Sequence, residues 1–129
     1  MSAEELVRRY LAAMERRDLA EARSCLAPGF TMVFPGGRRL SSLEELVEFA
    51  KARYRSARKT YERFDASGDV VYCFGTLSGE LLDGSPYGGI RFIDRFTVRD
   101  GKLVDQQVWN DMAEVLGSRI SNSPPRAAV

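Results

Sequence analysis

The 129-residue sequence predicts a single α+β domain in which three N-terminal helices cover one face of a long, curved, mostly antiparallel sheet. Three observations favour this fold class. Helix-capping motifs, followed by apolar residues spaced three and four apart, occupy the first part of the chain. Apolar and polar residues then alternate, and turn motifs divide this second part into strands. The length and the 44% hydrophobic content fit one core, which we assign to residues 1–120.

Each predicted helix begins at a capping motif. Ser2–Glu5 is a capping box, because the serine and the glutamate three residues later can each bond the other's backbone amide. Asp18–Glu21 and Ser42–Glu45 repeat the pattern. Two short helices therefore precede the first strand, and a third follows it. The predicted helices begin after Ser2, Asp18 and Ser42 and extend to about Met14, Leu26 and Arg58, respectively.

Five β-prone segments are bounded by turn residues. The first ends at Pro35-Gly36-Gly37, and Gly- and Asp-rich turns separate the last four, which we expect to form an antiparallel meander. A short helical turn begun by Asp111 should run through Leu116, and we expect residues 121–129 to be a disordered tail. The predicted strands are Phe30–Phe34, Thr60–Ala66, Val70–Leu82, Gly88–Arg99 and Lys102–Asn110.

The charges of the chain nearly cancel. The 19 Lys and Arg residues oppose 18 Asp and Glu residues, which leaves a net charge of +1. Such a balance gives no strong field for binding nucleic acid or an anionic membrane surface. No apolar run approaches the roughly 20 residues that span a bilayer, and the first residues are acidic rather than basic. We therefore expect a cytoplasmic protein without nucleic-acid or membrane partners.

The absence of histidine narrows the possible chemistry. It excludes Ser-His-Asp and Cys-His nucleophilic sites, His-liganded zinc and the commonest general base at neutral pH. Cys25 and Cys73 lie far apart inside apolar segments and form no C-x-x-C motif, so we expect core thiols and no metal. Any proton transfer then falls to Asp, Glu, Tyr or Lys, and we expect no cofactor.

One predicted strand carries a carboxylate on its apolar face. Alternation places Asp94 between Phe92 and Phe96 on the same side of the strand. An acid in that position either finds a hydrogen-bonding partner or takes up a proton more easily, since desolvation disfavours the charged form. Asp94 is therefore a candidate for acid catalysis, and the alternative is a structural acid bonded to backbone or to an arginine of a neighbouring element.

Two further residues are candidates to act with Asp94. Tyr10 lies on the apolar stripe of the first helix, so its hydroxyl either finds an internal partner or reaches the surface. Tyr10 and a protonated Asp94 would offer two donors to a developing oxyanion. Asp111 is either the N-cap of the last helical turn or a second carboxylate at the mouth of the pocket, where acid and base roles could be divided.

A pocket between the helices and the sheet should be mostly apolar and accept an apolar small molecule. The other face of the strand that holds Asp94 carries Arg91, Arg95 and Arg99, which either face solvent or pair with a second copy of the chain. The candidate ligand contacts are the aromatic residues Phe34, Tyr54, Phe74, Phe92 and Trp109.

Three segments carry a family resemblance. They are YLAAMERRDL at 10–19, LAPGFTMVFPG at 26–36, and a third that begins DRFTVRDGKLV at 94 and ends WND at 111. Their order and spacing over about Glu4 to Leu116 resemble the nuclear transport factor 2-like superfamily, especially its SnoaL-like branch. The resemblance implies a conical barrel of three helices packed into a strongly bent mixed sheet, an apolar pocket and a homodimer formed through the sheet face.

The superfamily includes ketosteroid isomerase, polyketide cyclases, an epoxide hydrolase and a dehydratase, so the fold does not fix the activity. The resemblance matches Tyr10 and Asp94 to the isomerase oxyanion hole, and Asp111 to a carboxylate of the cyclase and hydrolase branches. The general base of the isomerase falls on Phe34-Pro35 and is missing. The resemblance implies cofactor-free proton transfer on an apolar carbonyl-bearing or polycyclic substrate, or else a noncatalytic ligand-binding or dimerisation module.

Overall fold

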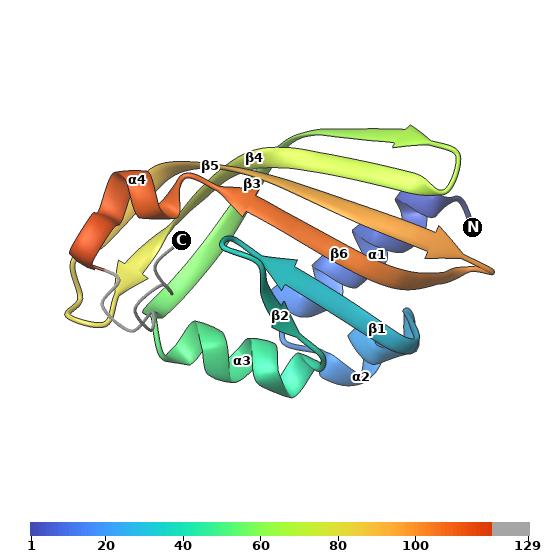
Figure 1. The fold of residues 1–129 in the computed structure, drawn as a ribbon, viewed down its shortest axis with the longest axis horizontal. Helices are drawn as coiled ribbons and strands as arrows, with labels where there is room; N and C mark the ends of the chain where they lie inside the picture. The colour runs from blue at the N-terminus through green and yellow to red at the C-terminus, as the bar shows by residue number, and fades with distance from the viewer. Residues whose placement is uncertain (120–129) are drawn as a thin grey trace.

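In a computed structural model, which describes residues 1–119, six strands form one curved sheet and the first three helices lie on its concave side (Figure 1). The predicted tail at 121–129 lies outside the described residues. The helices are α1 (Ala3–Glu15), α2 (Leu19–Ser24), α3 (Leu43–Lys51) and α4 (Met112–Leu116), with a 3-10 turn, η1, at Gly117–Arg119. The strands are β1 (Leu26–Phe34), β2 (Arg38–Leu40), β3 (Tyr54–Ser67), β4 (Val70–Leu81), β5 (Pro86–Arg99) and β6 (Lys102–Asn110).

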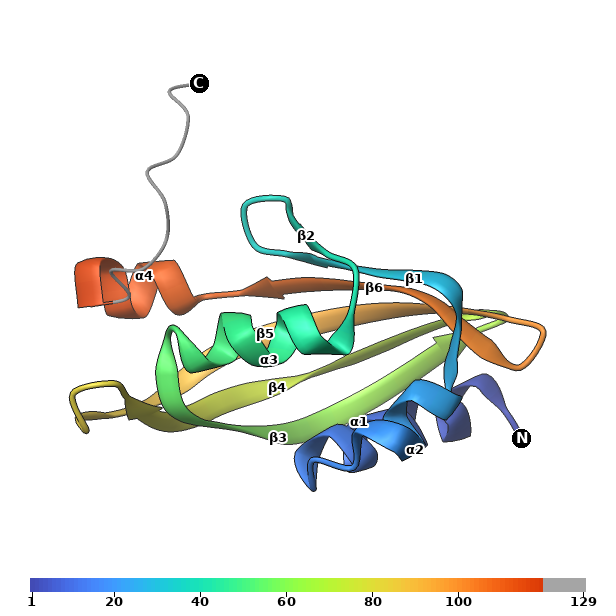
Figure 2. The same cartoon turned by 90° about the horizontal axis from the view of Figure 1, so that it is seen from below.

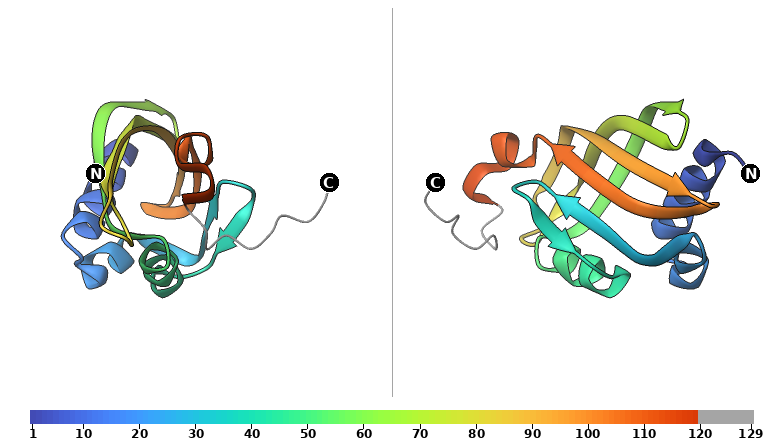
Figure 3. Two further views of the ribbon diagram at one scale, coloured as in Figure 1. Left: turned by 90° about the vertical axis from the view of Figure 1, so that its left-hand side faces the viewer. Right: turned by 45° about the vertical axis from the view of Figure 1, so that its right-hand side comes forward.

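The strands follow the order β2-β1-β6-β5-β4-β3. Strands β3 to β6 are consecutive antiparallel neighbours, as the predicted meander requires, whereas β1 runs parallel to β6. The sheet arches strongly, and α3 lies across the open side of the arch (Figure 3, left). Figure 2 shows α3 and the α1–α2 pair side by side in front of the sheet. The predicted fold class is therefore confirmed.

The predicted helix starts are also confirmed. Ser2 and Glu5 form both halves of the capping box, with the Glu5 amide donating to Ser2 Oγ at 3.1 Å and the Ser2 amide donating to Glu5 Oε1 at 2.9 Å. The side chains of Asp18 and Ser42 each accept a backbone N–H at the start of α2 and α3. These bonds satisfy amides that the first turn of a helix leaves unpaired, so the local sequence is sufficient to start each helix.

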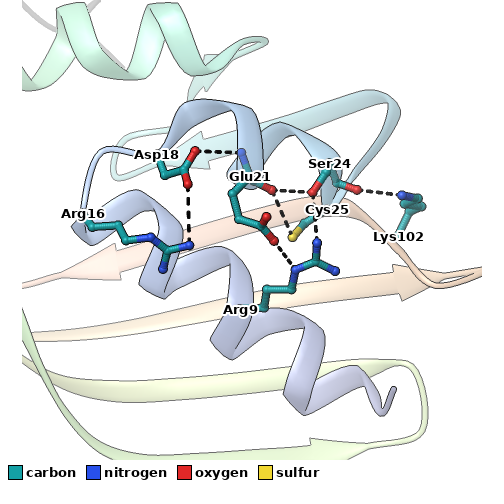
Figure 4. Close-up of polar contacts among 7 residues, drawn as sticks. All are labelled: Arg9, Arg16, Asp18, Glu21, Ser24, Cys25 and Lys102. Carbon is teal, nitrogen blue, oxygen red and sulfur yellow. Dashed lines mark hydrogen bonds and ion pairs between the residues drawn. The ribbon is translucent and has the colours of Figure 1, made fainter.

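Polar contacts fasten α2 to α1 and to the sheet (Figure 4). The Arg9 guanidinium of α1 pairs with Glu21 and donates to Ser24 Oγ at 3.4 Å. Lys102, at the start of β6, donates to the Ser24 carbonyl oxygen at 2.6 Å. These contacts help to keep α1 on the sheet with its apolar face, including the buried Tyr10, turned inward.

Three element boundaries differ from the prediction. Helix α3 ends at Lys51 rather than near Arg58, and β3 begins at Tyr54. The intervening residues suit a helix by composition, but pairing with β4 gives their backbone a hydrogen-bond ladder instead. Strand β1 begins at Leu26 rather than Phe30, because it first pairs with β6 there. Strand β2 was not predicted, since three residues carry too little alternation to be detected.

A bulge in β3 decides which of its side chains face the concave side. The pairing with β4 shifts just after Tyr61. Lys59 and Tyr61 precede the shift and Phe64 follows it, so residues of opposite parity come to lie on one face. Gly75 lies opposite Tyr61, where a Cβ atom would come within 1.9 Å of the Thr60 carbonyl oxygen. Glycine at this position lets the bulged strand approach β4.

None of the helices within residues 1–119 has both the length and the apolar character needed to cross a membrane.

Candidate functional site

A cavity of about 400 Å³ lies between the concave face of the sheet, α1 and α3. Its volume is within the range of small-molecule sites, and most of its wall is apolar or aromatic. Side chains from the sheet, from α1 and from α3 line the cavity. The apolar and aromatic lining residues are Tyr10, Leu11, Met14, Phe34, Leu46, Val47, Phe49, Ala50, Tyr54, Ala57, Tyr61, Leu77, Phe92 and Val108.

A polar cluster is set into this apolar wall. Lys59 of β3 donates from Nζ to Asp94 Oδ2 of β5 at 2.5 Å, and Gln106 Nε2 of β6 donates to the same oxygen at 3.3 Å. Asp94 is 0% exposed and Gln106 is 4% exposed. The Lys59 ammonium also lies 4.9 Å from the centre of the Phe92 ring, a favourable cation–π position. Three strands of the sheet, of which β3 is distant from the other two in sequence, thus converge on one carboxylate.

Three buried polar atoms in the cavity wall have no hydrogen-bond partner among the described residues. They are Asp94 Oδ1, Gln106 Oε1 and the Tyr10 hydroxyl. The Tyr10 ring is fixed between Phe30 and Phe96, with ring centres 6.1 Å from each. Buried polar groups are nearly always paired in folded proteins. These three atoms are therefore the unsatisfied polar groups of the cavity wall.

The charge states of the cluster follow from burial and from the Lys59–Asp94 pair. Burial by itself lowers the pKa of Lys59, but the charge of Asp94 and the hydrogen bond to it raise that pKa above its ordinary value. Burial raises the pKa of Tyr10, and it raises the pKa of Tyr61 to about 12. At neutral pH these shifts keep Lys59 as an ammonium and Tyr10 and Tyr61 neutral.

The structure places Asp94 in an ion pair with Lys59, whereas the resemblance implied a protonated, donating acid. One oxygen of Asp94 accepts from an ammonium, so the side chain is a hydrogen-bond acceptor. Its partner is Lys59 rather than an arginine. Sequence reasoning missed Lys59 because the residue lay between the predicted third helix, which ended near Arg58, and the strand predicted from Thr60. The available signal was the spacing of two between Lys59 and Tyr61, which puts both on one face of a strand.

Five of the eight predicted site residues line the cavity: Tyr10, Phe34, Tyr54, Phe92 and Asp94. Phe74 and Trp109 do not, and they lie together on the opposite face of the sheet. The register explains why, since the residues paired with Asp94 are Cys73 and Val108, and the next residue along each strand points to the opposite face.

Asp111 also lies outside the cavity wall. Its carboxylate accepts from Arg91 Nε at 2.5 Å on the outer side of the sheet. It occupies the N-cap position of α4 without a side-chain capping bond, and Asn110 Oδ1 accepts from the Met112 amide at 3.0 Å instead. The predicted helical turn from Asp111 through Leu116 is therefore confirmed with Asp111 at its N-cap position, and the Asp111 carboxylate pairs with Arg91 rather than lining the cavity.

Cys25 and Cys73 are buried and unpaired, in agreement with the predicted core thiols. Within residues 1–119 no three Cys, Asp or Glu side chains gather where they could hold a metal ion.

Comparison with known proteins places the chain in one family. A model of the SnoaL-like domain matches residues 7–106. No curated protein sequence matches the chain.

Solved structures resemble the chain over most of its length. One is an NTF2-like protein of unknown function from Burkholderia pseudomallei, with a TM-score of 0.81, 22% identity and coverage of 95% of this chain and 100% of that one. TerC, co-crystallised with polyporic acid, gives a TM-score of 0.75 at 23% identity, covering 87% and 93%. A putative SnoaL-like polyketide cyclase from Jannaschia gives 0.65 at 20% identity, covering 81% and 79%. At these sequence identities, the structural similarity shows that the chain shares the fold of these proteins.

Proposed function

The chain belongs to the SnoaL-like domain family, and from this we propose that it binds an apolar carbonyl-bearing small molecule and catalyses cofactor-free proton transfer on it. The observation that carries the proposal is the set of unpartnered polar atoms of Tyr10, Asp94 and Gln106 in one apolar cavity. The Tyr10 hydroxyl and the Lys59 ammonium are donors that suit the carbonyl oxygen of an otherwise apolar molecule, and the unpartnered Asp94 oxygen is available as a base.

Binding and activation of the carbonyl use the donors of the cluster. The Lys59 ammonium has three N–H bonds, and only one is needed for Asp94. The Tyr10 hydroxyl is the second donor, and its raised pKa keeps it protonated at neutral pH. Both would donate to the carbonyl oxygen and stabilise the negative charge that develops there, as in an oxyanion hole.

Asp94 takes the role of base, one of the two roles for which Asp111 was a candidate. Its free Oδ1 would remove a proton from the carbon next to the carbonyl. The electrons of the broken C–H bond form a C=C bond, and the carbonyl oxygen becomes an enolate oxygen. When the ketone carries a C=C bond between its β and γ carbons, the enolate is a dienolate, and return of the proton from Asp94 to the γ carbon gives the conjugated isomer. Attack of the enolate carbon on a second carbonyl closes a ring, after which the new alkoxide takes the proton.

The likeness in fold to a putative polyketide cyclase is in keeping with such a substrate, although fold alone does not assign an activity. The alternative is a noncatalytic ligand-binding module, in which the Lys59–Asp94 pair only holds the ligand. The two differ in whether a bound ketone loses its α-proton.

The test is hydrogen–deuterium exchange of 2-decalone, a saturated bicyclic ketone, followed by proton NMR in deuterated buffer. We expect the protein to accelerate exchange of the α-protons, and Asp94→Asn to lower the rate at least about 100-fold, the usual contribution of a general base. Thermal-shift titration with the ketone checks that the variant still binds it. Binding without exchange by the wild-type protein favours the noncatalytic module, and exchange that is unchanged in Asp94→Asn contradicts the proposal.

We also propose that the chain forms a homodimer through the outer face of the sheet. Tyr72, Ile93 and Trp109 are 39%, 45% and 49% exposed there. On the same face Arg95 Nε and Asp105 Oδ1 are buried without a hydrogen-bond partner among the described residues. A second copy would cover the apolar side chains and could pair these atoms. Analytical ultracentrifugation should show a dimer that Ile93→Glu converts to a monomer, and a monomeric wild-type protein contradicts the proposal.

A further inference from the structure

We infer that Asn110 determines substrate specificity at a second polar position of the cavity, where its side-chain NH2 group donates to a second oxygen of the ligand. The substrate class is then a rigid fused-ring ketone with another hydrogen-bond acceptor on the ring remote from the reacting carbonyl. The inference rests on the proposed function and adds the length and the second functional group of the substrate.

The orientation of the Asn110 amide is fixed by α4. Its Oδ1 accepts from the Met112 amide at 3.0 Å and caps that helix. Met112 is itself buried, which holds the first turn of α4 in place. With Oδ1 engaged, Nδ2 is the remaining polar atom of the side chain, and it donates to no described residue. Asn110 lines the cavity, so an anchored donor with two N–H bonds is available there.

The register of the sheet gives the spacing between the two polar positions. Asn110 pairs with Phe92, whereas Asp94 pairs with Val108. Phe92 and Asp94 are two residues apart on one face of β5, which corresponds to about 7 Å along the strand. Because neighbouring strands lie about 4.8 Å apart, the backbone positions of Asn110 and Asp94 are about 8 Å apart. The side chains between them, Phe92 and Val108, are apolar. A ligand that uses both positions therefore needs an apolar body of roughly two fused rings between its oxygens.

The cavity walls favour a rigid ring system over a flexible chain. Phe34 and Phe49 meet edge to face with ring centres 5.1 Å apart, and Tyr61 meets Phe92 in the same way at 5.8 Å. Packed aromatic walls of this kind offer flat surfaces to a flat or chair-like body. A rigid ligand also loses less conformational entropy on binding, so two fixed polar anchors select it more strongly.

The experiment compares 2-decalone with decalin-2,6-dione, which carries the second carbonyl on the other ring. After allowing for the two equivalent carbonyls of the dione, we expect the wild-type protein to show a KM about five-fold lower for the dione with a similar kcat. This ratio is what one hydrogen bond between neutral groups typically contributes. Asn110→Asp keeps the oxygen that caps α4 but replaces the donor with an acceptor, so the preference for the dione should disappear.

Two controls separate specificity from stability. Asn110→Ser retains a capping oxygen and is too short to reach the ligand, so it should lose the preference for the dione while α4 stays capped. Asp111→Asn changes the neighbouring residue on the outer side and should keep the preference. Equal KM values for both ketones in the wild-type protein, or a preference that survives in Asn110→Asp, would overturn this inference alone. Absence of exchange with both ketones would overturn the proposed function and this inference with it.

Discussion

Two ion pairs of the same length lie on opposite faces of one sheet. Lys59 contacts Asp94 at 2.5 Å on the concave side, and Arg91 contacts Asp111 at 2.5 Å on the convex side. The two side chains of the inner pair are 27% and 0% exposed, and those of the outer pair are 81% and 31% exposed. The difference shows that the N–O distance alone does not determine how much an ion pair contributes to stability.

The two ion pairs differ in their exposure to water. It screens the outer pair, so Arg91 and Asp111 gain little from each other. The inner carboxylate is shielded from solvent, so its energy depends on Lys59 and Gln106, and its second oxygen has no hydrogen-bond partner among the described residues. We therefore expect substitutions in the inner pair to change stability and activity strongly, and matched substitutions in the outer pair to change neither.

The largest effect on stability should come from Lys59→Met, which leaves Asp94 buried without its cation. We expect the free energy of unfolding to fall by about 3–5 kcal/mol, measured by urea denaturation. The double variant Lys59→Met/Asp94→Leu removes both charges and should regain most of the loss. If Lys59→Met is as stable as the wild-type protein, the inner ion pair contributes no more to stability than the outer one.

A smaller effect is expected for Tyr10→Phe, which removes a hydroxyl that has no partner within the described residues. Its stability should change by less than about 1 kcal/mol, because no hydrogen bond is lost. Exchange of 2-decalone should slow by about ten-fold or more, since one donor to the enolate oxygen is gone. Unchanged exchange would remove Tyr10 from the site and leave Lys59 as the donor.

The pH dependence of the inner pair sharpens the comparison further. The pKa of Lys59 is raised in the folded protein, so its contribution is complete below the unfolded value of about 10.4 and is lost as pH rises through the folded value. The stability difference between wild type and Lys59→Met should therefore be the same at about pH 7 and pH 9 and narrow above about pH 10.5. A difference that already shrinks between pH 7 and pH 9 would contradict a raised pKa.

The smallest effect should come from Arg91→Met on the convex face. Its guanidinium is mostly in water, so the denaturation midpoint and the rate of ketone exchange should equal those of the wild-type protein within experimental error. A clear loss of exchange would mean that the outer face contributes to the reaction.

Much of the fold could be predicted from local signals. The motifs at Ser2, Asp18 and Ser42 satisfy backbone amides within one turn, so each acts without tertiary contacts. Alternation around Asp94 also placed that carboxylate on the concave face, because a regular strand conserves parity. Predictions that rest on such short-range rules agree with the structure.

The remaining parts of the site depend on register between strands. Lys59 reaches Asp94 because β3 pairs with β4 in a register that a bulge after Tyr61 shifts by one residue. This shift turns the odd-numbered side chains before the bulge toward the concave face. Trp109 faces outward because Val108, and not Trp109, is opposite Asp94. Such pairings are set by contacts between residues far apart in sequence, and a single strand's pattern does not contain them.

The central claim is that the inner carboxylate, and not the outer one, carries the chemistry. The most direct test compares Asp94→Asn with Asp111→Asn in the same exchange reaction with 2-decalone, after both variants have been shown to bind the ketone and to unfold cooperatively. We predict that Asp94→Asn lowers the exchange rate at least about 100-fold while Asp111→Asn exchanges like the wild-type protein. Equal rates in the two variants, or a loss confined to Asp111→Asn, would contradict the claim.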